Sequence, residues 1–591
     1  MLNVRAFSST RSLHGVAARQ CLMLSVLACW LIALSGCAQI AVRHQSPEAL
    51  AEAAAEAELV SDLTVPYGIH PHVVHSTGLV VGLPGTGSDP ALGPGRQTMV
   101  EEIQRHGVPQ ADAFLSSPNT ALVNVRAMIP PGAQKGDRID VEVLVPRESQ
   151  TTSLADGRLL ETRLREFVRL GGRYREGHVM ALAKGSLLVD PAPEQERNPE
   201  SQLRARILGG AVAVKPRPLG LTLRPSARSI RNSRRIGTAI NKRFYTKQHG
   251  RTVGVANPKS DEYIDLIVHP RYKDNIQRYL EVLRSVAVGE AETQRRSRVA
   301  LLSRQLLDSI TTRAAALRLE ALGEHGREAL HTGLNSSNSE VRFHAAEALA
   351  YLDDPEAAAV LAEAVRDSAA FRAGALAALA VMDSPEAYDA LVNLLDSRSV
   401  EARYGAFHAL WKLNPGHPLV RGEDLNGTLT LHQVRSEGPA LIHVTRSRRP
   451  EVVVFGSEIT FLTPMVVDAG RHIMINGDAS GQVRLTRFST DDSERTVHVS
   501  NRLEDVIRAI VDLGGSYADV VDALSQARAS RSLDCRLAVD ALPSRGRPNR
   551  RTEGQMAESD TRSPQAADDA GASGLGRLRP ASWPAAEPGE P

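Results

Sequence analysis

The chain has 591 residues, of which 42% are hydrophobic and 23% are charged, which is more apolar sequence than a single core needs. The formal net charge of +2 argues against a nucleic-acid partner, and an aromatic content of 4% argues against an aromatic-rich binding cleft. Three of the four cysteines lie within the first 37 residues, so no internal disulfide framework is expected. We therefore expect a multidomain globular protein for which a structural or assembly role is open.

The chain begins with the pattern of a removable lipoprotein signal. A basic start and an uncharged run lead to the triplet Leu-Ser-Gly before Cys37, which is typical of a bacterial lipobox. We predict a signal peptide over residues 1–36, lipidation of the Cys37 thiol, and a lipidated tether over residues 37–60. Ala38 is not the aspartate that retains lipoproteins at the inner membrane, which favours the periplasmic face of the outer membrane. An uncleaved membrane anchor is the alternative, because residues 20–36 nearly reach the length of a span.

Strand-like segments dominate residues 61–199, which we expect to form a β-rich domain. Apolar runs and period-two alternation, punctuated by Gly, Pro and Asp, occur at 77–83, 121–127 and 138–145. Residues 200–290 are α/β in outline. There we expect strands at 208–214 and 263–269 and helices at 226–244 and 272–288.

A strong local charge bias lies in residues 201–260, which hold fourteen Lys and Arg and no Asp or Glu. Helical spacing places several of these bases on one face. One interpretation is a solvated helix face that acids elsewhere offset; the other is a surface for an acidic partner, either a protein or cell-wall carboxylates. The candidate contacts are Arg224, Arg228, Arg231, Arg234, Arg235, Lys242 and Arg243.

Residues 300–415 are rich in Ala and Leu and repeat with a period near thirty. The segment 341–350 recurs at 371–380 and again at 402–410, with a proline following each copy. Paired amphipathic helices at this period indicate an α-solenoid that resembles HEAT repeats. Residues 313–411 hold fifteen acids and eight bases, so this module could pair with the basic segment within one chain or between neighbours.

Residues 424–540 return to β-type alternation up to about residue 500, then predict helices at 503–513 and 517–527 and a closing strand near 535–539. Residues 541–591 are rich in Arg, Pro, Ser, Gly and Ala, and we predict a disordered tail. The fold class expected overall is α+β, with β-rich parts in two sequence segments interrupted by an all-α solenoid.

The glycine-rich segment from Gly82 through Gly85 and Gly87 superficially resembles a phosphate loop. It lacks the Gly-Lys-Ser/Thr ending that reaches the β- and γ-phosphates, so we interpret it as a turn that needs positive φ.

Three histidines, His70, His72 and His75, have a spacing that could suit a metal, but no nearby carboxylate or cysteine completes the set. We expect exposed loop histidines, and Cys535 as a small buried hydrophobe. No metal, no cofactor and no catalytic residue are predicted.

Four blocks in order resemble the family of bacterial flagellar basal-body P-ring proteins. They are His75–Asp89, Asn124–Val141, Ser153-Leu154 with Met180–Gly185, and Asn501–Val539. The resemblance covers about 60–288 and 424–540. The lipobox, the inserted repeats and the tail depart from the family pattern, as does the absence of a second cysteine near Pro464 that could pair with Cys535.

The resemblance implies a structural protein and not an enzyme. Identical copies would assemble as a closed ring around the flagellar distal rod, in the periplasm at the cell-wall layer, and would act as a bushing that supports rotation in flagellum-dependent motility. The implied partners are further copies of the chain, the rod, the L-ring protein and peptidoglycan. The alternative is an outer-membrane lipoprotein adaptor, outside any flagellum, whose HEAT-like repeats bind a protein partner.

Overall fold

The structure is a computed structural model that describes residues 57–105, 110–170, 173–189, 199–248, 250–456, 458–488 and 494–546. The predicted signal peptide, the lipidation site Cys37, most of the tether and nearly all of the predicted tail lie outside these residues. The described residues up to Arg545 form one compact unit. None of the described helices combines the length and the apolar character that a membrane span needs.

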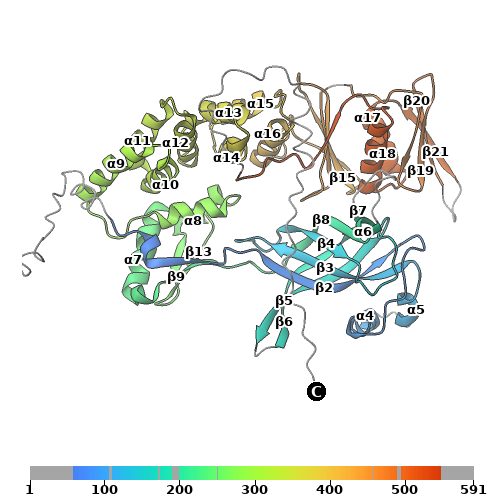
Figure 1. The fold of residues 1–591 in the computed structure, drawn as a ribbon, viewed down its shortest axis with the longest axis horizontal. Helices are drawn as coiled ribbons and strands as arrows, with labels where there is room; N and C mark the ends of the chain where they lie inside the picture. Colours follow the sequence, from blue (N-terminus) through green and yellow to red (C-terminus); the bar gives the residue numbers. More distant parts are fainter. Residues whose placement is uncertain are drawn as a thin grey trace, which may run out of the picture. The chain divides into compact units, whose positions relative to one another are not determined.

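The first β-rich part is a seven-stranded sheet that closes on itself (Figure 1). The strand order is β4-β3-β2-β5-β6-β8-β7, and an additional β4–β8 pairing completes a barrel. Alternate side chains point inward, and Val74, Val125, Val141, Leu164 and Ala211 are fully buried there. The strands are β2 (His72–Val81), β3 (Thr120–Ile129), β4 (Arg138–Leu144), β5 (Arg158–Leu170), β6 (Arg173–Ser186), β7 (Leu188–Val189) and β8 (Arg204–Ala213).

Three short helices accompany the barrel. Helices α4 (Pro94–Arg105) and α5 (Ala111–Leu115) cover the outer side of β2 at Leu79, which shares a small apolar cluster with Met99 and Leu115. Helix α6 (Pro199–Gln202) precedes β8. Since β8 pairs with β4 and β6, the barrel continues beyond residue 199.

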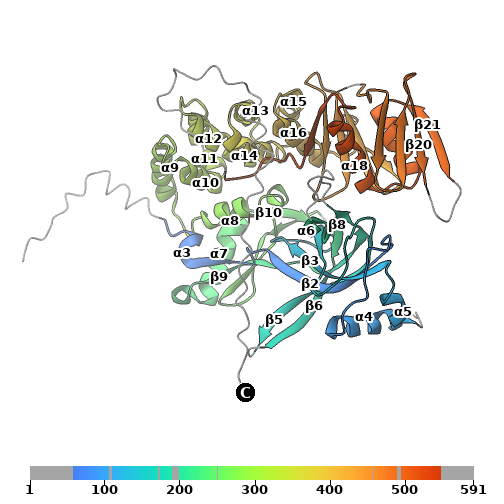
Figure 2. The same cartoon turned by 45° about the vertical axis from the view of Figure 1, so that its right-hand side comes forward.

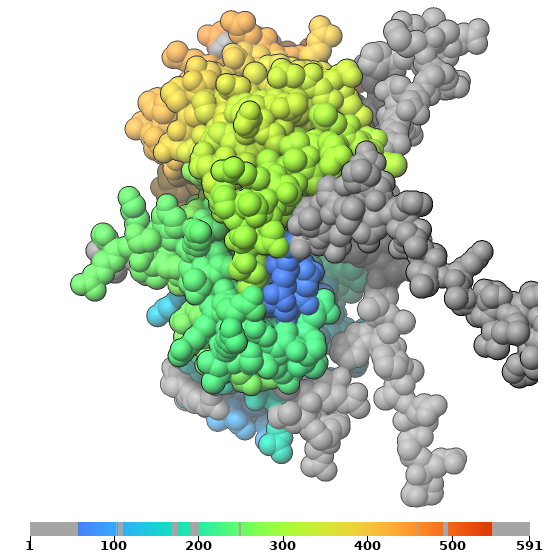
Figure 3. All heavy atoms as spheres, turned by 90° about the vertical axis from the view of Figure 1, so that its left-hand side faces the viewer, coloured from blue at the N-terminus to red at the C-terminus, as the bar shows by residue number. Residues whose placement is uncertain are grey.

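The α/β part is built on a four-stranded sheet in the order β1-β9-β13-β12. Its core joins Leu221 and Ile264 of the sheet to Ile236 of α7 and Tyr279 of α8. Figure 3 shows the blue segment of α3 (Val60–Leu63) set among the green residues of this part. The remaining elements are β1 (Thr64–Tyr67), β9 (Leu219–Leu223), η2 (Pro225–Ala227), α7 (Ile230–Arg243), β10 (Tyr245–Gln248), β11 (Arg251–Gly254), β12 (Ala256–Pro258), β13 (Tyr263–Leu266), η3 (Pro270–Tyr272) and α8 (Ile276–Arg284).

A run of helices follows and confirms the predicted solenoid (Figure 1). The three repeated segments lie on α12, α14 and α16, with the stacked rings of Phe343 and Phe371 4.4 Å apart between neighbouring repeats. Alanines at the helix contacts let the backbones approach closely. The helices are α9 (Glu292–Leu306), α10 (Thr312–Leu322), α11 (Glu324–Leu334), α12 (Ser339–Tyr351), α13 (Ala357–Asp367), α14 (Ala369–Leu379), α15 (Pro385–Leu394) and α16 (Val400–Leu413).

The C-terminal part places two helices between two sheets (Figures 1 and 2). Its apolar cluster joins Val452 and Val454 of one sheet, Ile475 of the other, and Ile507 and Leu524 of the helices. The five-stranded sheet has the order β14-β15-β17-β16-β22 and the four-stranded sheet the order β18-β19-β20-β21. The elements are β14 (Glu423–Leu425), β15 (Leu429–Val434), β16 (Leu441–Val444), β17 (Glu451–Phe455), β18 (Met465–Ala469), β19 (Ile473–Gly477), β20 (Gln482–Arg487), β21 (Arg495–Ser500), α17 (Leu503–Asp512), α18 (Tyr517–Ala529) and β22 (Arg536–Val539).

Both helices predicted in the α/β part start later than the sequence pattern suggested, because polar caps define their first turns. Ser229 Oγ accepts a hydrogen bond from Asn232 N at 3.1 Å, and Asn275 Oδ1 accepts one from Arg278 N at 3.2 Å. The segment before Ser229 forms the 3₁₀ turn η2, and the chain before Asn275 forms η3. The mixed α+β class is as predicted.

Candidate functional surface: the basic helix α7

Helix α7 carries five of the seven basic residues that the sequence singles out. It buries Ile236 and Ile240 against the α/β core and turns its other side to solvent. Lys242 and Arg243 lie in the last turn, where cations interact favourably with the negative end of the helix dipole. The apolar spacing of α7 therefore orients the charged face outward.

Three of the seven candidates are already partnered within the chain. Arg228 Nη1 lies 3.1 Å from Glu262 Oε2, and Arg235 Nη2 lies 3.4 Å from Glu58 Oε2. Arg243 Nη2 donates to the Glu320 carbonyl oxygen of α10 at 3.0 Å, and its guanidinium lies over the Phe244 ring. The exposed pairs contribute little stability, but they offset charge locally.

The other four candidates form a different group. Arg224, Arg231, Arg234 and Lys242 are exposed, and within the described part of the chain their side chains have no hydrogen bond or ion pair. Arg231 and Lys242 are eleven positions apart, so the helical repeat places them within roughly 20° of one another, with Arg234 about 60° away. These three side chains make one unpaired positive face, which we call the α7 basic face.

The acidic solenoid uses many of its carboxylates internally. The arginine at the same place in each repeat donates to a backbone carbonyl before its own helix, as Arg342 does to Ser336 O and Arg372 to Val365 O. The same two arginines pair with Glu363 at 3.0 Å and Glu401 at 2.8 Å. These ion pairs therefore neutralise part of the negative charge of the solenoid.

The third repeat arginine, Arg403, has no following repeat to bind. It is almost fully buried, and it donates to Leu395 O at 3.0 Å, to Pro439 O at 2.6 Å and to Ser436 Oγ at 2.9 Å. Pro439 and Ser436 lie between β15 and β16, so Arg403 joins the end of the solenoid to the C-terminal sheet.

A second group of charges on the outside of the barrel is not predicted from the sequence. Cross-strand pairing aligns Arg165 of β5, His75 of β2, Arg126 of β3, Glu142 of β4 and Arg206 of β8 in one row. Burial, and then the Arg126 charge, lower the pKa of His75, so its imidazole is neutral at neutral pH. Alternating basic residues in each strand hint at such a row, but the register that aligns them is not visible in the sequence.

The glycine-rich segment is a turn after β2. Gly82 and Gly85 have φ values of +78° and +73°, where glycine is favoured, whereas Gly87 is close to Thr120. Gly85 N donates to Asn119 Oδ1 at 3.2 Å, and Gly87 N donates to Pro118 O at 2.8 Å. The segment docks against the start of β3.

The expectation of loop histidines is wrong for His72 and His75, which lie on strand β2, and the structure brings a carboxylate to His72. Glu166 Oε2 lies 3.4 Å from His72 Nε2, and Glu166 Oε1 lies 3.2 Å from His178 Nδ1. The ring of His75 stacks on Phe167 instead. Among the residues that the structure describes, no three His, Cys, Asp or Glu side chains are grouped so that they could hold a metal ion.

Comparison with known proteins finds similarity over the barrel and the α/β part. Residues 60–305 match the flagellar P-ring protein family. Residues 299–380 match HEAT repeats. The P-ring resemblance and the HEAT-like module predicted from the sequence are thus confirmed over these ranges, whereas the resemblance of residues 424–540 and the lipobox stay predictions.

Several curated flagellar P-ring proteins are similar to this chain. That of Albidiferax ferrireducens is 32% identical over 222 residues, which are 34% of this chain and 56% of the relative. That of Thermotoga maritima is 28% identical over 239 residues, 39% of this chain and 66% of the relative, and that of Wolinella succinogenes is 25% identical over 237 residues, 38% and 65%. The chain thus spans between about half and two thirds of the length of these P-ring relatives.

A solved structure, the complex of CpcE and CpcF of phycocyanin lyase from Nostoc, is similar to a smaller part. The match is 22% identical, covers 21% of this chain and 82% of that chain, and has a TM-score of 0.18.

Proposed function

We propose that this protein is a structural subunit of a flagellar basal-body P ring. The observation that carries the proposal is the P-ring family match over residues 60–305, a range that holds the barrel and the α/β part. Identical copies would contact one another head to tail and close a ring around the distal rod in the periplasm. The ring would act as a bushing that supports rotation, with the L-ring protein and peptidoglycan as neighbours.

The role proposed is structural and not catalytic. The relatives that support it are named for a ring, and the α7 basic face and the barrel row are surfaces for contact rather than enclosed reaction sites.

The α7 basic face would meet an acidic neighbour: the rod, the cell wall or the solenoid of an adjacent copy. Its three side chains are the basic residues of α7 that have no hydrogen bond or ion pair within the described part of the chain. The solenoid has exposed acids, such as Glu328 and Glu386, that could pair with them. Charge complementarity of this kind fixes orientation and speeds association more than it adds affinity.

Charge reversal of this face tests the proposed contact. The variant Arg231→Glu/Arg234→Glu/Lys242→Glu should reduce motility and the yield of assembled rings at normal protein levels. Arg235 is left in place because it already pairs with Glu58. A control with the same charge change replaces exposed arginines of the C-terminal part and should retain motility; it is Arg484→Glu/Arg495→Glu/Arg502→Glu. Normal motility of the first variant would show that the α7 basic face does not make the proposed contact.

Lipidation at Cys37 would tether each subunit to the periplasmic face of the outer membrane, because buried acyl chains contribute about 0.8 kcal/mol per methylene. A Cys37→Ser variant should then leave the membrane fraction. Its retention there would contradict the tether.

A second candidate rests on the HEAT match over residues 299–380. In it, the protein is an outer-membrane lipoprotein adaptor whose solenoid binds a protein partner outside any flagellum. Electron cryo-microscopy of purified basal bodies, with antibody against residues 300–415, separates the two functions. Label in a ring around the distal rod supports the P-ring subunit, and intact basal bodies without label favour the adaptor.

A further inference from the structure

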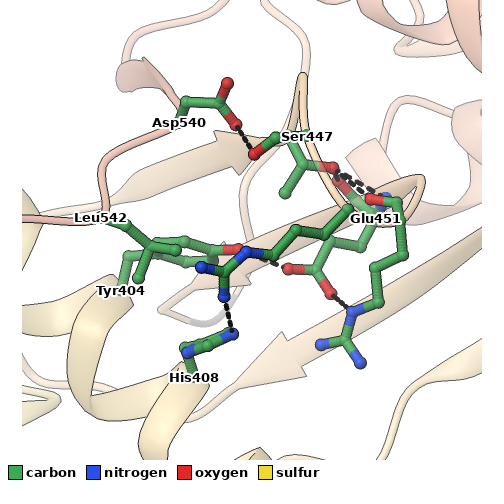
Figure 4. A pocket seen from close by; sticks show the side chains of 9 residues that line it. Tyr404, His408, Ser447, Glu451, Asp540 and Leu542 are labelled. Atoms are coloured by element: carbon green, nitrogen blue, oxygen red, sulfur yellow. Dashed lines mark hydrogen bonds and ion pairs between the residues drawn. The ribbon is translucent and has the colours of Figure 1, made fainter. Parts of the chain in front are cut away.

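A small cavity lies where the end of the solenoid meets the C-terminal part (Figure 4). Helix α16 contributes His408, the β16–β17 loop contributes Arg448, and Asp540 follows β22. The cavity has a volume of about 100 Å³, which suits a group of a few heavy atoms. The same loop touches the barrel, because Arg448 N donates to the Asp140 carboxylate at 2.8 Å.

The two carboxylates that line the cavity are engaged in the protein itself. Glu451, which is almost fully buried, accepts a hydrogen bond from the Tyr404 hydroxyl at 2.6 Å and pairs with Arg449. Asp540 Oδ1 accepts hydrogen bonds from Arg446 N at 2.8 Å and from Ser447 Oγ at 3.2 Å. Neither acid forms an ion pair with the remaining cation of the cavity.

That remaining cation is Arg448. Its side chain is exposed, its Nη1 lies 3.2 Å from His408 Nε2, and it has no carboxylate partner for its guanidinium among the residues described. Figure 4 shows the side chains of Tyr404, His408 and Asp540, which line the cavity. An arginine has five N–H donors, so one contact to an imidazole leaves most of them unused.

The surroundings of His408 are positive as well. Burial, and then the charges of Lys412, Arg448 and Arg449, lower the pKa of His408 to about 2. The imidazole is therefore neutral and accepts from Arg448 rather than competing for an anion. Lys412 is itself paired with Asp274 at 3.0 Å, and Arg449 is paired with Glu451, so Arg448 is the arginine of the cavity lining that has no ion pair among the residues described.

We propose that this cavity binds a single carboxylate group, held by the guanidinium of Arg448. A planar carboxylate matches the planar donor fork of arginine and accepts two parallel hydrogen bonds. The negative charges of Glu451 and Asp540 oppose every anion in the cavity, and they oppose a dianion such as hydrogen phosphate about twice as strongly as a carboxylate monoanion. The bound carboxylate would lie at the junction of the barrel, the solenoid and the C-terminal part, where it would interact with their charged side chains. This inference does not depend on the proposed P-ring function.

The test is a titration of the full chain with sodium acetate at constant ionic strength, with chloride as the balancing anion. The readout is the ring nitrogen resonance of His408, assigned by its disappearance in a His408→Asn variant. We expect a saturable shift with half-saturation in the millimolar range, as is reasonable for one small charged group. A shift that grows linearly without saturation would overturn the proposal.

Two variants make the test specific. Arg448→Asn keeps a residue that tolerates the φ of +67° found at this position, and it should raise the half-saturating acetate concentration about ten-fold or more. Arg484→Asn, the matched change of an exposed arginine on β20, should leave it unchanged. Equal saturation of Arg448→Asn and the wild type, or saturation by phosphate at a lower concentration than by acetate, would refute carboxylate recognition by Arg448.

Discussion

Arg278 of α8 lies between two carboxylates of the solenoid, and its replacement by methionine tests how the solenoid is held to the α/β part. Arg278 Nε donates to Glu320 Oε2 at 3.1 Å, and its Nη1 lies 2.6 Å from Glu347 Oε2. The side chains of Arg278 and Glu320 are 8% and 0% exposed, and the guanidinium also lies over the Tyr351 ring. Methionine keeps the packing volume and removes the charge, so both carboxylates would lose their counter-ion.

The size of the expected stability loss follows from the burial of the Arg278 ion pairs. Removing one partner of a buried ion pair costs about 3–5 kcal/mol, because the remaining charge is left uncompensated. Here both carboxylates lose the Arg278 charge that favours their ionised forms, and the Glu347 charge also raises the pKa of Glu320. We expect Arg278→Met to lower the free energy of unfolding by that amount and the melting temperature by roughly 3–5 °C, because a unit of this size has an unfolding entropy of about 1 kcal/mol/K.

The pH dependence supplies an independent check. Burial opposes ionisation of Glu347, but the neighbouring Arg278 charge prevails and lowers the pKa of this carboxyl to about 2 from its ordinary 4.5. A depressed carboxyl pKa contributes stability that is present above pH 4.5 and lost as the pH falls through about 2. Arg278→Met lacks this contribution, so the gap between variant and wild type should narrow as the pH falls below about 4.5.

Scanning calorimetry of the full chain between about pH 2 and pH 7 measures both effects, because the predicted loss lies between the two pKa values of Glu347. The control is Arg296→Met, which breaks the 3.3 Å pair with Glu292 on α9, where the arginine side chain is 80% exposed. That variant should change stability by less than about 0.5 kcal/mol. A loss below about 1 kcal/mol in Arg278→Met, or a gap that stays constant with pH, would refute the reasoning.

Three further predictions concern single sites. Gly87→Ala should lower stability by about 1–3 kcal/mol in urea unfolding, since a Cβ there would collide with the Thr120 carbonyl; wild-type stability would contradict the close approach. Burial lowers the pKa of His443 to about 3 from 6.5, so the unfolded chain binds a proton first and stability falls as the pH drops from 6.5 toward 3. His443→Phe keeps the stacking on Tyr404 and should flatten that decline in melting curves; an unchanged slope would assign the decline to other groups. Burial raises the pKa of the Cys535 thiol to about 11, so iodoacetamide at pH 8 should label this cysteine slowly in the native chain and rapidly in urea, and equal rates would place it at the surface.

The helical and strand segments follow closely from local sequence. The spacing of Ile236 and Ile240 predicts α7, and the thirty-residue repeat predicts the solenoid helices, because side-chain periodicity records which face of an element is buried. Helix starts are less visible, since Ser229 acts as a cap while the residues before it form a 3₁₀ turn. The hairpin of β5 and β6 and the helices α4 and α5 are not predicted, because their patterns are short or mixed.

The seven basic candidates show what cannot be predicted from local sequence. Their spacing places most of them on one side of a helix, but their separation into paired and unpaired groups depends on Glu58, Glu262 and Glu320, which are distant in sequence. The cavity also depends on residues that are distant in sequence, because Arg448 and His408 are forty positions apart.

The sequence by itself determined the order of modules, the positions of most helices and strands, and the family resemblance, since these depend on residue type and spacing along the chain. The tertiary structure decided that β4 meets β8 and closes the barrel, that Arg165, His75, Arg126 and Arg206 share one row, and that Arg403 joins the solenoid to the C-terminal sheet. These contacts form between residues far apart in the chain, and they depend on strand register and packing, which no local pattern encodes.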